Sequence, residues 1–199
     1  MTARTARLLL ALGAFVAGLV LFSAVIFIVT GRTPAPTIVG PSAIGGPFRL
    51  VDHNARPLSD QTVKGRPFLV FFGFTHCPDI CPTTLFEVSE ILRALGPDAD
   101  RVSALFVTVD PERDTPDKLK DYLSSFDPHL VGATGDPEAV KAMEKAYRVY
   151  AKKVPLDGGG YTMDHTALVY LMDKEGRFVA PFNVKRRPAD AATDLRRYL

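Results

Sequence analysis

The amino-terminal part of the sequence contains an apolar run, residues 8–29, that has 22 residues and no charge. A helix needs roughly 20 apolar residues to cross about 30 Å of hydrocarbon, so the run predicts a membrane-spanning helix over residues 8–30. A cleaved signal peptide has an apolar core of only about 7–15 residues before a small-residue cleavage site. This run is longer and leads into Thr30-Gly31-Arg32, so we expect an anchor that stays on the protein.

The charges on either side of the run predict how the anchor is oriented. Arg4 and Arg7 precede it and Arg32 alone follows it closely, and positive residues collect on the cytoplasmic side of a membrane. We therefore expect residues 1–7 in the cytoplasm and everything beyond Gly31 outside it. Seven residues are too few for an Arg-rich transit peptide, which favours a single-pass protein of a bacterial inner membrane with its domain in the periplasm.

Residues 31–47 are rich in proline and glycine, a composition that resists both helix and sheet. We expect a tether there and one domain over residues 48–199, because the chain has room for one anchor and one domain of ordinary size. Residues 1–32 hold three of the 24 basic residues and no acidic one, so 21 basic and 22 acidic residues remain beyond them. Bulk charge therefore does not suggest a nucleic-acid partner.

Apolar strands and amphipathic helices alternate along the domain. A continuous apolar strand over residues 67–72 precedes a helical stripe that ends at Gly96-Pro97, and a second helix begins at Pro116 with Thr115 as its N-cap. A strand at residues 48–51, a turn at residues 52–56 and a chain that reaches residues 64–66 predict a short two-stranded entry to the domain. Further strands are expected at residues 102–109, 130–133, 149–153, 167–172 and 178–182, and further helices at residues 137–147 and from residue 188. This alternation predicts an α/β fold with a central sheet, flanking helices and an antiparallel hairpin at one edge.

Two cysteines stand where the strand over residues 67–72 leads into its helix, and they are the only cysteines of the chain, Cys77 and Cys81. Two thiols four positions apart at a helix start can come within disulfide range, and the helix dipole favours their thiolates. The pair is therefore both oxidisable and a set of soft ligands that suits Cu(I) better than hard ions.

Two other roles for the cysteines are less well supported by the sequence. A structural disulfide between them would close a very short loop and would contribute little to stability. A closed zinc site needs two further protein ligands, and the sequence has neither a second Cys-x-x-Cys nor a His-x-x-x-His. Two sulfurs and some further ligand remain.

The four histidines compete for the place of that further ligand. His165 is expected in a loop between a glycine turn and an apolar strand. His76 adjoins the first cysteine but is expected to point away from the same ion, His53 lies in a turn near the start of the domain, and His129 follows Asp127-Pro128 in a loop. The residue pattern alone does not choose among them.

Three stretches of the sequence resemble the signature motifs of the Sco/SenC family. They are Gly73-Phe74-Thr75-His76-Cys77-Pro78-Asp79-Ile80-Cys81-Pro82, Val109-Asp110-Pro111-Glu112-Arg113-Asp114-Thr115-Pro116, and Asp164-His165. The resemblance covers roughly residues 47–185. It implies a thioredoxin-like fold of the peroxiredoxin type, a membrane tether, and a site for Cu(I) and Cu(II) formed by Cys77, Cys81 and His165. It also implies assembly of the binuclear copper centre of cytochrome c oxidase, by copper delivery, by reduction of the oxidase cysteines, or by both.

The chain departs from the family pattern on both sides of the last motif. The family usually has a serine after the histidine and a small or valine-like residue before the aspartate, where this chain has Thr166 and Met163. Threonine is chemically close to serine, so the ligand assignment stands. We interpret Met163 as a packing residue, because an unbranched methionine beside an apolar strand is more often packing than a thioether ligand.

The acidic residues near these motifs are expected to support the site from outside it. Asp164 is expected to orient the imidazole of His165 through its second nitrogen, and Asp79 either tunes the site or caps the helix. The loop after the second strand is expected to be organised by three residues that do not touch metal, namely Asp110, Arg113 and Asp114.

The leading hypothesis is a metallochaperone that receives copper from another periplasmic chaperone, is kept reduced by a thioredoxin-like reductant, and passes copper to the copper-centre subunit of cytochrome c oxidase. The alternative is a thiol-disulfide oxidoreductase in which Cys77 and Cys81 are the redox-active pair and reduce that subunit's cysteines. The four-residue spacing, and the lack of a Thr-Pro before the strand at His165, argue against a broad-specificity reductase. A thiol peroxidase is weaker still, because the step Thr75-His76-Cys77 differs from that of peroxiredoxins and the chain has no tryptophan.

Overall fold

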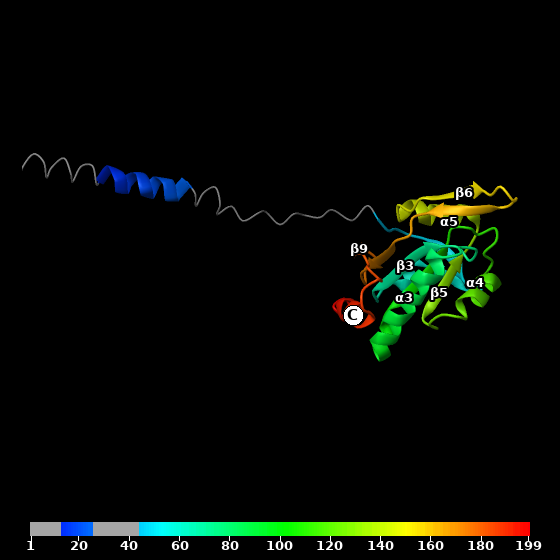
Figure 1. The fold of residues 1–199 in the computed structure, drawn as a ribbon. Coiled ribbons are helices and arrows are strands. Elements are labelled where there is room, and N and C mark those ends of the chain that lie inside the picture. Colours follow the sequence, from blue (N-terminus) through cyan, green and yellow to red (C-terminus); the bar gives the residue numbers. More distant parts are fainter. Residues whose placement is uncertain (1–12, 26–43) are drawn as a thin grey trace, which may run out of the picture. The chain divides into compact units, whose positions relative to one another are not determined.

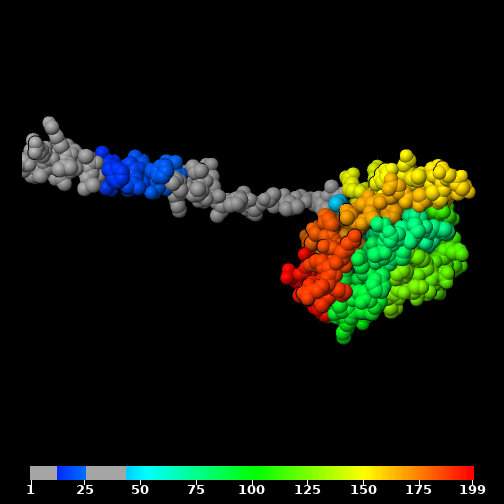
Figure 2. Space-filling model, viewed as in Figure 1, coloured from blue at the N-terminus to red at the C-terminus, as the bar shows by residue number. Residues whose placement is uncertain are grey.

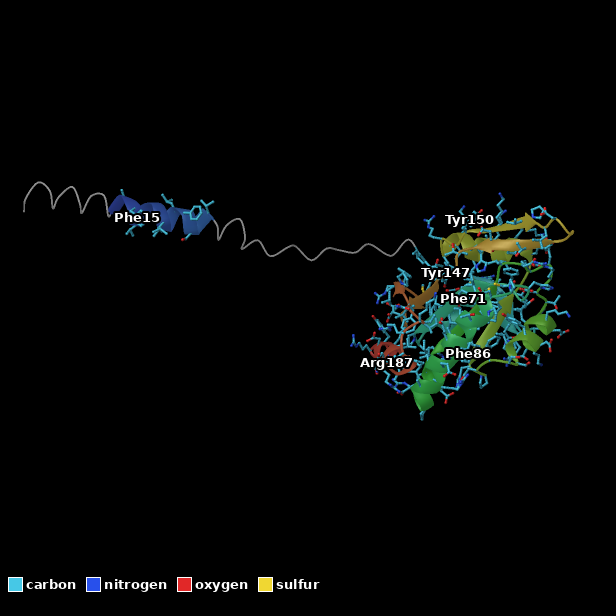
Figure 3. The ribbon with its side chains drawn as sticks, viewed as in Figure 1. Phe15, Phe71, Phe86, Tyr147, Tyr150 and Arg187 are labelled. Carbon is cyan, nitrogen blue, oxygen red and sulfur yellow. The ribbon has the colours of Figure 1, made fainter. Side chains whose placement is uncertain are left out.

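The structure is a computed structural model that describes residues 13–25 and 44–199, which belong to separate units. Residues 13–25 form a helix with exposed apolar side chains such as Phe15 (Figure 3). Within these described ranges, no helix is both long enough and apolar enough to cross a membrane. Much of the predicted amino-terminal part lies outside the described residues. This holds for residues 1–7, for the two ends of the anchor over residues 8–30, and for most of the tether.

A mixed seven-stranded sheet runs through residues 44–199, with its strands in the order β2-β1-β5-β4-β3-β8-β9 (Figure 1). The strands are β1 (Arg49–Asp52), β2 (Pro57–Ser59), β3 (Phe68–Gly73), β4 (Ser103–Thr108), β5 (Leu130–Thr134), β8 (Val169–Met172) and β9 (Phe178–Pro181). The three central strands β3, β4 and β5 are parallel, and the outer strands are antiparallel to their neighbours. The predicted α/β fold with a central sheet and an antiparallel edge hairpin is confirmed.

The helices begin and end at residues whose local chemistry marks a boundary. They are α2 (Asp60–Val63), α3 (Ile80–Leu95), α4 (Pro116–Leu123), α5 (Pro137–Ala146) and α6 (Pro188–Arg196), with a 3₁₀ helix η1 (Gly96–Arg101) after α3. The Thr115 side chain accepts the backbone N–H of Lys118 and so caps α4, as predicted. Helix α3 ends at Gly96, whose positive φ of 59° is one that glycine adopts without strain.

Alternate residues of β3 face opposite layers of the domain. Phe71 contacts Phe106 on one face, and the Phe106 ring lies 5.8 Å from that of Tyr122 in α4. Phe72 on the other face lies 5.6 Å from the ring of Tyr147, directly after α5. Helix α4 therefore covers one face of the sheet, together with α3 and the adjoining α6, and α5 covers the other (Figures 1 and 3). The parallel strands deliver the loops after β3 and β4 to the same edge of the sheet.

A two-stranded hairpin stands outside the central sheet, formed by β6 (Ala151–Pro155) and β7 (Tyr161–His165). The hairpin lies along one end of the domain, where β6 is largely exposed and β7 is mostly half-buried (yellow to light orange in Figure 2). Ala151 pairs with His165 and Pro155 with Tyr161. The sequence predicted β6 but not β7, and placing His165 in a loop was wrong. Strand β7 was not predicted because its residues are mostly polar and directly follow three glycines.

The two-stranded entry expected between residues 48 and 66 is confirmed, because β1 pairs with β2 in an antiparallel manner. Its extent was wrong, because β2 ends at Ser59 and the chain then forms α2. The Thr62 hydroxyl accepts the backbone N–H of Ser59 and donates to the Ser59 carbonyl. These contacts start α2 where the second strand was expected to continue.

His129 connects two loops of the domain through its two ring nitrogens. Nδ1 lies 2.6 Å from Asp127 Oδ1 and Nε2 lies 3.1 Å from Asp100 Oδ1. The hydrogen bond to Asp127, helped by Asp100, raises the pKa of His129 above its ordinary value. The imidazolium therefore stabilises the fold at low pH.

We expect His129→Gln to lower the free energy of unfolding more at about pH 6 than at about pH 9. A raised folded-state pKa means that the stabilisation is complete below the unfolded pKa of about 6.5 and is lost as the pH rises through the folded value. Urea unfolding of both proteins at the two pH values measures the difference. The same loss at both pH values would contradict the prediction.

Candidate metal centre

Cys77 and Cys81 lie on either side of the point where the chain enters α3. Cys77 is in the preceding loop and half-buried, whereas Cys81 is in the first turn of the helix and buried, and both are free thiols. The backbone N–H of Cys81 donates to Cys77 Sγ at 3.4 Å. Asp79 occupies the N-cap position but its side chain accepts no capping hydrogen bond, so of the two roles left open for Asp79 the side-chain cap was wrong. The Cys77 sulfur takes one of the free helix N–H groups instead.

Gly73, the last residue of β3, lets the buried thiol approach the sheet. A Cβ at this position would lie 2.8 Å from Cys81 Sγ and 2.7 Å from Phe106 Cε2, closer than such atoms can pack. This role of Gly73 was not predicted. A glycine at the end of an apolar strand is nonetheless a signal of close approach by another group.

His165 reaches the thiols from the end of β7. Its Nε2 lies 3.7 Å from Cys81 Sγ, and its Nδ1 lies 3.1 Å from the carbonyl oxygen of Thr166. A carbonyl can only accept, so Nδ1 carries the proton and the lone pair of Nε2 faces the sulfur. The imidazole packs edge-on against two buried rings, with centroids 6.4 Å from Phe71 and 5.7 Å from Phe74.

Asp164 does not orient this imidazole. It is exposed, and it alternates with His165 along β7, so its side chain points to the opposite face of the strand. The prediction for Asp164 was therefore wrong, and the backbone carbonyl of Thr166 has the role instead. Met163, on the same face as His165, packs against the core as interpreted from the sequence.

The structure brings the three predicted ligands together from three different segments. The ligand atoms of Cys77, Cys81 and His165 all lie within 4.8 Å of one another, and the described residues contain no other such group of three metal-ligating side chains. Two sulfurs and one imidazole nitrogen form a soft donor set of the kind that copper prefers. The donor chemistry therefore fits copper.

Burial dominates the acid-base chemistry of the inner thiol. It raises the pKa of Cys81 well above its ordinary value, and the neighbouring Cys77 and Asp114 raise it further. The expectation that the helix dipole favours a thiolate was thus wrong for Cys81 in the metal-free protein, because desolvation outweighs the dipole. A bound metal cation reverses this balance, since a coordinating thiol is deprotonated outright.

Asp114 holds the loop that carries Cys77. Its fully buried carboxylate accepts three hydrogen bonds, from Thr75 N at 3.0 Å, Thr75 Oγ1 at 2.6 Å and Thr108 Oγ1 at 2.7 Å. The Asp110 carbonyl accepts the N–H groups of Arg113 and Asp114 in the same loop. These contacts agree with the prediction that the acidic residues after the second strand organise the loop rather than face the metal.

Comparison with known proteins places the whole domain in one group. A family model described as SCO1/SenC matches residues 37–199. The mitochondrial SCO1 homologue of Mus musculus is 38% identical over 160 residues, which are 79% of this chain and 56% of the mouse protein. The chain spans about half the length of the mouse, yeast and Arabidopsis relatives it matches.

Two solved structures are similar in both sequence and fold. The structure of Bradyrhizobium japonicum ScoI with copper bound is 64% identical, with a TM-score of 0.77 over 78% of this chain and 99% of that one. The crystal structure of Arabidopsis thaliana ScoI with copper bound is 34% identical, with a TM-score of 0.71 over 77% of this chain and 98% of that one. Together with the donor set, they support copper binding by this fold.

We expect Gly73→Ala to destabilise the domain by about 1–3 kcal/mol, the usual range for an overpacked core, and to displace the buried Cys81 thiol. Urea unfolding measures the first effect and thiol labelling of the metal-free protein the second. Gly158→Ala is the matched control, because a Cβ at Gly158 meets nothing within 4 Å. Equal stability and equal labelling of the two variants would contradict the role assigned to Gly73.

Proposed function

The chain belongs to the SCO1/SenC family, and from this membership we propose that it carries copper as its cargo and delivers it to the binuclear copper centre of cytochrome c oxidase. The observation that carries the proposal is the convergence of Cys77, Cys81 and His165 within 4.8 Å. Two relatives that share most of the domain are known with copper bound. The same fold, and a donor set in this chain that suits copper, support the same cargo here.

The three ligands have different roles toward the two oxidation states of copper. Two thiolates suit soft Cu(I), while the imidazole of His165 adds the harder nitrogen donor that Cu(II) favours. The Nε2 atom of His165 already faces Cys81, so little reorganisation is needed for it to bind. Cys81 must release its proton as the ion enters, since its thiol is protonated in the metal-free protein.

Unequal burial of the thiols supports a stepwise transfer. Three ligands leave an open position on copper, and a thiolate of the acceptor takes that position from the side of half-buried Cys77 while buried Cys81 still holds the ion. The ion then passes between proteins without being released into solution. A second copper chaperone supplies the ion, and a thioredoxin-like reductant keeps both thiols reduced, because a disulfide between them removes both sulfur ligands.

The amino-terminal residues place this exchange at a membrane. A single-pass anchor over residues 8–30 and a tether over residues 31–47 hold a domain over residues 48–199 at a bacterial inner membrane, with residues 1–7 in the cytoplasm and the domain in the periplasm. The support is the uncharged run of 22 residues and the arginines before it.

We expect His165→Ala to weaken Cu(II) binding by more than the roughly 10–100-fold that loss of an outer-sphere partner costs, and Cu(I) binding by less than about tenfold, because both sulfurs remain. Competition titrations against chelators measure both affinities. His76→Ala is the matched control, since His76 is exposed and adjoins Cys77 without belonging to the ligand cluster. Comparable losses for the two ions would contradict this division of roles.

A second candidate function is thiol-disulfide exchange with the acceptor's copper-ligating cysteines. The observation that favours it is again the unequal burial, because half-buried Cys77 can attack an incoming disulfide and buried Cys81 can resolve the mixed disulfide. Two thiols are oxidised to a disulfide as the acceptor disulfide is reduced to two thiols, so the electrons and protons balance without copper.

For this second function we expect the reduced, copper-free protein to reduce an oxidised acceptor fragment, and Cys81→Ser to accumulate a mixed disulfide through Cys77. Thiol trapping followed by mass spectrometry measures both products. Cys77→Ser is the control and should form no mixed disulfide with the fragment. If the reduced wild-type protein leaves the oxidised fragment unchanged, the oxidoreductase function is rejected and copper delivery remains.

A further inference from the structure

The nitrogen ligand is attached to the domain differently from the two sulfurs. Both cysteines adjoin α3, which packs on the central sheet, whereas His165 is at the end of β7 in a hairpin that shares no ladder with that sheet. Tyr161 and His165 are four residues apart in β7, so their side chains lie on the same face of the strand. The position of His165 therefore depends on what holds this face of the hairpin to the domain.

Tyr161, at the far end of the same strand, makes the polar contacts of that face. Its hydroxyl donates to Asp110 Oδ1 at 2.8 Å, and its carbonyl oxygen accepts from Arg113 Nη1 at 3.0 Å. The guanidinium carbon of Arg113 lies 3.8 Å from the centroid of the Tyr161 ring. Arg113 Nε also donates to Asp110 Oδ2, so the three residues close a ring of contacts. We call Tyr161, Asp110 and Arg113 the tyrosine clamp.

Burial makes the clamp stronger than a second polar link between hairpin and domain, the Lys153–Glu112 ion pair. The Asp110 side chain is fully buried and that of Arg113 is only a quarter exposed, and a buried hydrogen bond to a charged group is stronger than one between neutral groups. The Lys153–Glu112 ion pair also joins β6 to the loop after β4, but both of its side chains are exposed. Exposed ion pairs contribute little.

The clamp and the sulfur side of the site share one loop. Asp110 and Arg113 belong to the same segment, residues 109–115, as Asp114, which binds the Thr75 backbone and side chain in the loop of Cys77. Arg113 also lies over the Phe74 ring at 6.0 Å, and the same ring contacts the His165 imidazole. One short loop thus reaches both the segment that carries a sulfur and the strand that carries the nitrogen.

From this arrangement we propose that Tyr161 is a positioning residue of the copper site: through Asp110 and Arg113 it holds β7 at the place where Nε2 of His165 meets the two sulfurs. The inference rests on the proposed copper function. A clamp at one end of β7 and the aromatic pocket of Phe71 and Phe74 at the other restrict the strand at both ends. Loosening the clamp lets His165 move relative to the sulfurs, and the ion that needs the nitrogen most, Cu(II), is affected most.

The test is Tyr161→Phe, which removes one hydroxyl and keeps the ring on which Arg113 stacks. Loss of a hydrogen bond to a buried carboxylate predicts a fall in Cu(II) affinity of about tenfold, with Cu(I) affinity changed by less than about twofold. In the metal-free protein we expect the His165 ring signals in nuclear magnetic resonance spectra to broaden or shift. In the Cu(II) form we expect weaker or heterogeneous nitrogen coupling in electron paramagnetic resonance spectra.

Tyr150→Phe is the matched control. Tyr150 directly precedes β6, its side chain is exposed, and its hydroxyl forms no hydrogen bond within the part of the chain that the structure describes. This variant should behave as the wild type in every measurement. Arg113→Lys is the second clamp variant, since it keeps a charge beside buried Asp110 but loses the planar group that stacks on Tyr161. It should change Cu(II) affinity and the His165 signals in the same direction as Tyr161→Phe.

Unchanged Cu(II) affinity and unchanged His165 signals in Tyr161→Phe would overturn the inference. Equal weakening of Cu(I) and Cu(II), together with a lower unfolding midpoint, would also overturn it, because a general loss of structure does not distinguish the ions. The proposed function fails if the wild-type protein binds no copper, or if His165→Ala binds Cu(II) as tightly as the wild type. The positioning role of Tyr161 then fails with it. Normal wild-type binding with a silent Tyr161→Phe variant overturns the positioning role alone.

Discussion

The buried carboxylate of Asp114 joins the loop after β4 to the loop that carries Cys77. A carboxylate without solvent is costly unless donors surround it, and this one accepts two hydrogen bonds from Thr75 and one from Thr108. Because Thr108 ends β4 and Thr75 follows β3, the bonds couple the ends of two neighbouring parallel strands. The Cys77 loop therefore cannot shift without breaking buried hydrogen bonds to Asp114, and this loop is held to the end of the sheet.

Rigidity and access are divided between the two sulfurs. Cys81 is enclosed by α3 and β3, where Gly73 leaves it just enough room, and burial keeps its thiol protonated in the metal-free protein. Cys77 is half-buried in the loop, within reach of another molecule. A site that must both hold and release an ion needs these opposite properties in neighbouring ligands. The same asymmetry suits thiol exchange, which is why geometry alone supports two functions for one pair.

Local chemistry explains which parts of the fold could be predicted. The strand β3 is a continuous apolar run, α4 begins at the Thr115-Pro116 pair and α3 ends at Gly96, and each signal lies within a few residues. Strand β7 was missed because its polar residues pair only with β6 and leave no apolar pattern. The pKa of Cys81 and the partners of Tyr161 depend on segments up to 51 residues away in sequence, and no local pattern contains that information.

The choice among the four histidines shows what tertiary structure adds to the residue pattern. Nδ1 of His53 accepts the N–H of Gly132, and both nitrogens of His129 lie beside carboxylates. His76 is exposed, with its Nδ1 beside the hydroxyl of Thr75. Only in His165 does a backbone carbonyl take the proton of one nitrogen while the lone pair of the other faces a thiol, among the histidines that the structure describes. A ligand nitrogen needs this tautomer and this direction, and both are properties of the folded hairpin rather than of the residues next to it in sequence.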